Sequence, residues 1–136
     1  MAIPKIIIDT CIVSYVMRGS PEAPAYAAHL KGKLIAISFI TVGELYYGAE
    51  KGHWGQKKRL QLETAIKNYV VIPYDHEIAK QYGKVIVERQ RLGRPISFND
   101  AWIAACAVRH GTPLVTHNFK DFEAISGLQV ITEKTP

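Results

Sequence analysis

The sequence predicts an α/β fold, a three-layer α/β/α sandwich around a central, mostly parallel sheet. Short β-branched runs alternate along the chain with longer segments of helical periodicity, which is the order that a parallel sheet requires. The runs are apolar at consecutive positions, as in strands that are covered on both faces. Residues 101–108 are apolar without interruption, which indicates a helix buried against the sheet.

Five runs are predicted strands, and turn residues separate them from six predicted helices. The strands are expected at residues 5–8, 34–37, 69–72, 114–116 and 129–132. The helices are expected at residues 10–18, 23–30, 38–50, 56–68, 76–92 and 98–110, with Asp75 capping the fifth. The inward face of the fourth helix is expected to carry Leu60, Leu62, Ala65 and Ile66. No repeat or linker interrupts the pattern, so we interpret residues 1–136 as a single domain.

The composition is that of a basic, globular protein with reduced cysteines. Apolar residues make up 48% of the chain, and 17 Lys+Arg outnumber 12 Asp+Glu, which favours polyanionic partners. Cys11 and Cys106 both have apolar sequence neighbours and form neither a zinc motif nor a disulfide framework. No run reaches the roughly 18 apolar residues of a membrane span, and Asp9 interrupts the first run too early for a signal peptide. A cytoplasmic location without membrane attachment is therefore expected.

Acidic residues stand where predicted strands end or predicted helices begin. Asp9 directly follows the first strand, and Glu44 lies near the start of the helix after the second. Asp100 opens the helix before the fourth strand, and Asp121 follows that strand. Because ligands of parallel sheets bind beyond the carboxyl ends of the strands, we expect these four acids at one edge of the sheet.

Each acid alone has a structural explanation. Thr41–Glu44 and Ser97–Asp100 have the spacing of a helix capping box, and the helix dipole favours an acid in a first turn without any catalysis. Asp121 could cap a turn. Asp9 is harder to explain in this way, because it ends a buried strand.

Taken together, the four carboxylates indicate a bound cation. Two carboxylates about 5 Å apart repel by roughly 3 kcal/mol at an effective dielectric near 20. Several of them at one edge need a cation or a shared proton. Oxygen donors without His or Cys suit Mg²⁺ or Mn²⁺, and such an ion on a basic protein indicates phosphodiester hydrolysis.

Four segments of the chain recur together, in the same order and spacing, in one known family. They are Ile6–Thr10, Ile37–Gly48, Ile96–Ala105 and Leu114–Phe122. With them the chain resembles the PIN-domain ribonucleases, specifically the toxins of VapBC-type toxin–antitoxin pairs, over essentially its whole length. The resemblance implies an α/β/α fold, a homodimer, and Mg²⁺- or Mn²⁺-dependent endonuclease activity on RNA. It also implies a cognate antitoxin that covers the acidic site.

The resemblance assigns catalytic and metal-binding roles to Asp9, Glu44 and Asp100, which fall on the family's three shared acidic positions. By spacing, the fourth acidic position falls on Asn118, and Asp121 is the acid that can substitute for it. The sequence leaves open which of these two residues supplies the fourth position.

Three polar residues are expected to support the acids, namely Thr10, Thr116 and Asn118, although capping or turn formation is an alternative role for each hydroxyl. Cys11 stands where the family commonly has Asn. Loss of that amide is expected to loosen the support of Asp9. The histidine nearest the acids is His117, which could carry a proton or be a passive loop residue.

Two basic segments are candidate RNA contacts. Trp54, Lys57 and Lys58 lie on a predicted loop and helix start, where cations can hold phosphates and the indole can stack on a base. The alternative is a solvated loop with Trp54 folded onto the protein. The second segment carries Arg89, Arg91 and Arg94 just before the Asp100 helix, and Arg94 is the residue expected to contact a backbone phosphate. The alternative is an exposed helix end, which favours cations.

Two other function classes compete with the ribonuclease. A catalytically inactive PIN-fold nucleic-acid-binding or scaffold module would tolerate Cys11 and Asn118, but it would not need three repelling acids. A receiver-like phosphotransfer domain would use Asp9 as a nucleophile, but it needs a lysine after the fourth strand, where only Lys120 is found. The sequence therefore favours the ribonuclease.

Overall fold

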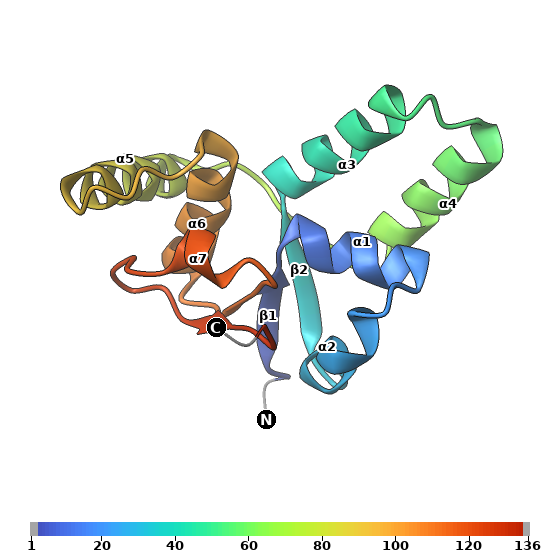
Figure 1. Ribbon diagram of the computed structural model, residues 1–136, viewed down its shortest axis with the longest axis horizontal. Helices are drawn as coiled ribbons and strands as arrows, with labels where there is room; N and C mark the ends of the chain where they lie inside the picture. The colour runs from blue at the N-terminus through green and yellow to red at the C-terminus, as the bar shows by residue number, and fades with distance from the viewer. Residues whose placement is uncertain (1–2, 135–136) are drawn as a thin grey trace.

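A computed structural model describes residues 3–134 and contains one parallel sheet (Figure 1). The strands are β1 (Lys5–Ile8), β2 (Leu34–Ser38), β3 (Val70–Ile72), β4 (Leu114–Val115) and β5 (Val130–Ile131). Their order in the sheet is β3-β2-β1-β4-β5, and every neighbouring pair is parallel. The predicted α/β class is confirmed. Because β1 is central, the residue that follows it lies in the middle of the carboxyl edge.

Helices join the strands. They are α1 (Thr10–Arg18), α2 (Ala23–Leu30), α3 (Phe39–Lys51), α4 (Gln56–Ile66), α5 (His76–Arg91), α6 (Phe98–His110) and α7 (Phe119–Phe122). The six predicted helices are present, with bounds that differ by at most two residues. The short α7 was not predicted, because four residues show no periodicity. No helix within residues 3–134 has the length and apolar content that crossing a bilayer requires.

Two hydrophobic clusters cover the two faces of the sheet. β1 contributes side chains to both, because successive residues of a strand point to opposite faces. Ile7 belongs to the cluster beneath α5, α6 and α7, which we call the α6 cluster. Ile6 and Ile8 belong to the cluster beneath α1, α2, α3 and α4, which we call the α1 cluster. Figure 1 shows the two helical layers on opposite sides of the strands, which is the predicted sandwich.

The start of α3 corrects one prediction. The N-terminal cap is Ser38, whose Oγ accepts a hydrogen bond from the backbone N of Thr41 at 3.1 Å. Thr41 therefore lies inside the helix, and the capping box expected from Thr41 to Glu44 is wrong. At α6 the predicted cap is confirmed, because Ser97 Oγ accepts from the backbone N of Asp100 at 3.2 Å.

The inward face of α4 is narrower than predicted. Leu62 is fully buried in the α1 cluster, whereas Leu60 is 53% exposed. Residues two positions apart point to different sides of a helix, so Leu60 and Leu62 cannot share one face. The prediction that Leu60 faces inward is wrong, and Leu60 contributes to the outer surface of α4.

Candidate active site

The carboxyl edge of the sheet brings together the elements that carry the four acids. Asp9 follows β1 and caps α1, while Glu44 lies in the second turn of α3, directly after β2. Asp100 is in the first turn of α6, and Asp121 is on α7, which follows β4. Asp9, Glu44 and Asp121 follow parallel strands and so reach the same edge of the sheet, while Asp100 begins the helix that leads back to β4.

Asp9 is buried and fully hydrogen-bonded. It is 5% exposed, and its Oδ1 accepts from the backbone N of Thr10 at 2.8 Å. Its Oδ2 accepts from Thr116 Oγ1 at 2.8 Å. Burial raises the pKa of Asp9 above its usual range, the Glu44 charge adds to the increase, and the hydrogen bonds oppose it. Folding therefore holds this carboxylate in one orientation.

Glu44 is joined to Asp9 through one threonine. Thr10 Oγ1 donates to Glu44 Oε1 at 2.7 Å, while the backbone N of the same residue serves Asp9. The other oxygen, Oε2, lies 3.4 Å from Asn99 Nδ2. The hydroxyl of the buried Thr41 lies 3.0 Å from Thr10 Oγ1, which ties the end of β1 to the start of α3. Thr10 thus donates hydrogen bonds to two acids.

The pKa of Asp100 depends on the other three acids. Burial raises its pKa, and the charges of Asp9, Asp121 and Glu44 raise it further, to about 6, against a hydrogen bond from Ser97. All three other predicted acids therefore act on this one carboxyl group. The structure places the four acids together at one edge.

The two candidates for the fourth position occupy different roles. Asp121 is exposed on α7, and its charge is among those that raise the pKa of Asp100. Asn118 precedes α7 without a capping hydrogen bond from its side chain, and its backbone N donates to Thr116 Oγ1 at 3.0 Å. The geometry thus favours Asp121 as the fourth acid, while Asn118 helps to orient the hydroxyl that reaches Asp9.

Cys11 packs against the α1 cluster, in agreement with its apolar sequence neighbours, but its thiol also contacts the acidic site. Its Sγ is 3.4 Å from Asp9 Oδ2 and 3.9 Å from Thr116 Oγ1. Burial and the charge of Asp9 raise the pKa of the thiol to about 12. The thiol therefore keeps its proton at neutral pH and donates to Asp9, so a weak donor stands where the family commonly has an amide.

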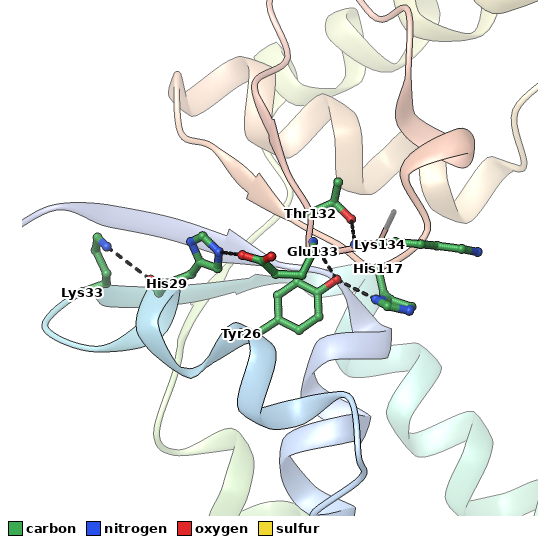
Figure 2. Close-up of polar contacts among 7 residues, drawn as sticks. All are labelled: Tyr26, His29, Lys33, His117, Thr132, Glu133 and Lys134. Atoms are coloured by element: carbon green, nitrogen blue, oxygen red, sulfur yellow. Dashed lines mark hydrogen bonds and ion pairs between the residues drawn. The ribbon is translucent and has the colours of Figure 1, made fainter. Parts of the chain in front are cut away.

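His117 is held by a buried tyrosine (Figure 2). The Tyr26 hydroxyl, on α2, lies 2.6 Å from His117 Nδ1 and accepts from the backbone N of Glu133 at 3.1 Å. Since the phenol oxygen accepts from Glu133, its own proton is available to His117 Nδ1. The Glu133 carboxylate in turn pairs with His29 at 2.5 Å. This ring nitrogen of His117 is thus engaged in joining β4, α2 and the segment after β5.

The side chains at the acidic edge offer oxygen ligands for a divalent metal ion. Within residues 3–134, no three Asp, Glu, His or Cys side chains form a ready-made metal cage. Mg²⁺ does not need one, because it keeps several waters and binds proteins through one or two carboxylates. Carboxylate and hydroxyl oxygens are the ligands it prefers, and a cation would relieve the part of the raised pKa of Asp100 that, after burial, comes from the charges of the other acids. The residues present fit such an ion.

The predicted RNA contacts are dispersed. Trp54 packs against the α1 cluster, with Lys58 Nζ 4.0 Å from its ring centroid, while Lys57 is exposed. Arg94 Nη1 pairs with Glu123 Oε1 at 2.7 Å. Arg89 is only 4% exposed, so the alternative of an exposed helix end does not apply to it. A basic side chain at a helix end gives no sequence signal for burial.

Comparison with known proteins agrees with this architecture. A family profile described as PIN domain matches residues 6–128. Ribonuclease VapC2 of Haemophilus influenzae is 32% identical over 92% of this chain and 95% of its own length. The tRNA(fMet)-specific endonuclease VapC of Shigella flexneri is 31% identical over 92% and 95%.

Solved structures share the fold at high similarity. The VapBC2 complex of Rickettsia felis, bound to a DNA fragment from its promoter, contains a chain with TM-score 0.84 and 27% identity. The match covers 94% of this chain and 98% of that one. VapBC-1 from nontypeable Haemophilus influenzae gives TM-score 0.76 and 31% identity over 94% and 97%. Fold, acidic edge and sequence similarity together show that this chain belongs to the PIN-domain family, among the VapC ribonucleases.

Proposed function

We propose that this chain is a divalent-metal-dependent endoribonuclease and the toxin of a toxin–antitoxin pair. The observation that carries the proposal is the state of Asp100, whose pKa is raised to about 6 by burial and by the charges of Asp9, Asp121 and Glu44. Such mutual perturbation of acids at the carboxyl edge of a parallel sheet is typical of a catalytic centre. Curated relatives that are named ribonucleases support the assignment.

The four acids would hold Mg²⁺ or Mn²⁺ between them. When bound, the ion supplies Lewis acidity to the phosphodiester and to the attacking water. Asp9 supplies a fixed anion, since Thr10, Thr116 and Cys11 occupy its oxygens. Glu44 is kept within reach of it by Thr10. Asp100 and Asp121 form the less constrained side of the site, where the charges of neighbouring acids help to raise the pKa of Asp100.

The proposed substrate is RNA, and the proposed partners are an antitoxin protein and a second copy of the chain. A formal net charge of +5 favours a polyanionic substrate. The Shigella flexneri relative is named for its specificity for tRNA(fMet), so transfer RNA is the first substrate class to test. The VapBC structures that share this fold are toxin–antitoxin complexes, which supports the antitoxin. An acidic edge that includes the exposed Asp121 is a natural receptor for an arginine of such a partner.

The test is cleavage of total bacterial RNA by folded protein freed of any antitoxin. Wild type and Asp100→Asn are compared in Mg²⁺, in Mn²⁺ and in EDTA. Discrete fragments that require the metal and vanish with Asp100→Asn support the proposal, and sequencing the fragment ends names the target. Intact RNA with wild type and both metals would instead favour the catalytically inactive binding module.

A further inference from the structure

Arg89 is a buried cation without an acidic partner among the described residues. It lies on α5 and is 4% exposed. Its guanidinium donates to three backbone carbonyls, those of Arg94 at 2.8 Å, Asp121 at 2.9 Å and Glu123 at 3.2 Å. A charge this deeply buried is tolerated only where its donors are satisfied, so these bonds are the reason why it can occupy this position.

Two of the three carbonyls belong to α7 and to the residue that follows it. This helix has only four residues, and no side chain caps its N-terminus. A single helical turn is not stable by itself, so external contacts must hold it. Phe122 anchors it through the α6 cluster, and Arg89 anchors its backbone to α5.

The same segment is also held at the surface. Arg94 Nη1 pairs with Glu123 Oε1 at 2.7 Å, and the Arg94 carbonyl is one of the acceptors of Arg89. The two arginines thus hold Asp121 and Glu123 by main chain and side chain together. Asp121 itself is exposed, and its carboxylate accepts no hydrogen bond from residues 3–134, so its position depends on its backbone.

We infer that Arg89 is a positioning residue, which fixes the backbone of Asp121 so that this carboxylate stays near Asp100 and contributes to cation binding. The inference rests on the proposed function and deepens it. It gives α5, which carries none of the four acids, a role in the metal affinity of the site. It also explains how a four-residue helix can present a metal ligand without a cap of its own.

The experiment compares Arg89→Met and Arg89→Lys with wild type. Methionine keeps length and apolar bulk but removes every donor, whereas lysine keeps the charge and loses the fork that reaches several carbonyls. The matched control is Lys84→Met, which truncates an exposed cation on the same helix. Hydrogen exchange of residues 119–124 is measured without metal, and Mn²⁺ affinity is measured by calorimetry.

Arg89→Met is expected to speed exchange in residues 119–124 and to weaken Mn²⁺ binding about 10- to 100-fold, with Arg89→Lys intermediate and Lys84→Met unchanged. Introduced into Asp121→Asn, the Arg89→Met change should weaken Mn²⁺ binding no further, because Asp121 is the group through which it acts. If Arg89→Met does not fold, Arg89→Lys alone carries the comparison.

Unchanged Mn²⁺ affinity in folded Arg89→Met or Arg89→Lys would overturn the inference, as would an equal further loss in the Asp121→Asn background. These outcomes are separable from failure of the proposed function. Wild type that cleaves RNA while Arg89 variants bind Mn²⁺ normally refutes only the role of Arg89. Wild type that leaves RNA intact while Arg89→Met loses Mn²⁺ affinity refutes the nuclease and retains the positioning role.

Discussion

The two halves of the acidic edge are built in different ways. Asp9 and Glu44 are held by side chains and backbone of Thr10, Thr116, Cys11 and Asn99, which fill their oxygens with donors. On the other half, Ser97 alone lowers the pKa of Asp100, and the carboxylate of Asp121 accepts no hydrogen bond from residues 3–134. In the first half, hydrogen bonds formed during folding fix the orientation of the carboxylates of Asp9 and Glu44. In the second half, burial and then the charges of the other acids raise the pKa of Asp100, so a cation should affect this half most.

The largest effect on RNA cleavage is expected when Asp9, in the half that hydrogen bonds hold fixed, loses its charge. Asp9→Asn keeps the shape of the buried side chain but removes its negative charge, so cleavage of RNA should fall by more than about 100-fold, beyond the loss typical of supporting residues. Asp75→Asn is the control, because Asp75 caps α5 away from the acids. Equal cleavage by Asp9→Asn and wild type, measured on the same RNA, would show that the fixed half is not catalytic.

The next effect tests whether the hydrogen bonds matter beyond the charge. Thr116→Val removes the hydroxyl that donates to Asp9 and accepts from the backbone N of Asn118. We expect about 10- to 100-fold weaker Mn²⁺ binding. Loss of buried hydrogen bonds should also lower the free energy of unfolding by about 1–3 kcal/mol.

Thr132→Val provides the matched control for Thr116→Val. Thr132 follows β5, the strand beside β4, and within residues 3–134 its hydroxyl accepts only an exposed backbone N–H, that of Lys134. Calorimetry should show unchanged Mn²⁺ affinity for this variant. A similar loss in both variants would mean that the edge of the sheet is generally sensitive, and that Thr116 has no special role.

The second half of the edge, with Asp100 and Asp121, should make the stability of the protein without metal depend on pH. Burial and neighbouring charges raise the pKa of Asp100 to about 6, so the folded state binds this proton more tightly than the unfolded state does. The corresponding stabilisation is complete below the unfolded pKa and is lost as pH rises through about 6. Thermal unfolding in EDTA should therefore occur at higher temperature near pH 5 than near pH 7.

Asp100→Asn should flatten that pH dependence, and saturating Mg²⁺ should flatten it in wild type. Asp9 contributes in the same direction, because burial also raises its pKa, so a smaller slope should persist in the variant. An unfolding temperature that increases from pH 5 to pH 7 without metal would contradict the picture of repelling acids.

The smallest effect concerns the thiol. Cys11→Ala removes a weak donor to Asp9 but leaves the backbone N of Thr10 and the Thr116 hydroxyl in place. A two- to fivefold loss of Mn²⁺ affinity is expected, the equivalent of about 0.5–1 kcal/mol. Cys11→Asn, which introduces the amide common in the family, should bind Mn²⁺ at least as tightly as wild type. A loss as large as that of Thr116→Val would mean that the thiol is a principal support of Asp9.

Local pattern predicted most of the fold and the four acids. Apolar runs and helical periodicity located five strands and six helices, and strand ends located Asp9 and Glu44 because a parallel sheet gathers its carboxyl ends. The α7 helix escaped prediction because it is too short to show a period. The apolar character of Leu60 predicts burial, but its position two residues from Leu62 turns it to the outer side of α4.

The contacts within the site were less predictable, because they join residues far apart in sequence. Thr116 reaches Asp9 across 107 positions, and Arg89 reaches Asp121 across 32. A buried arginine that binds carbonyls has the same sequence appearance as an exposed one near a helix end. Chemistry that depends on such long-range contacts becomes visible only when the elements are packed.

Two of the acids coincide with helix starts, since Asp9 caps α1 and Asp100 lies in the first turn of α6. The partial positive charge at a helix start offsets part of the negative charge even when no ion is bound. In a zinc finger the ligands find their places only with the metal, whereas an acidic edge whose charge is offset in this way does not need an ion in order to fold. Under the proposed function, folding and activation by metal are thereby separate events, each open to control at its own time.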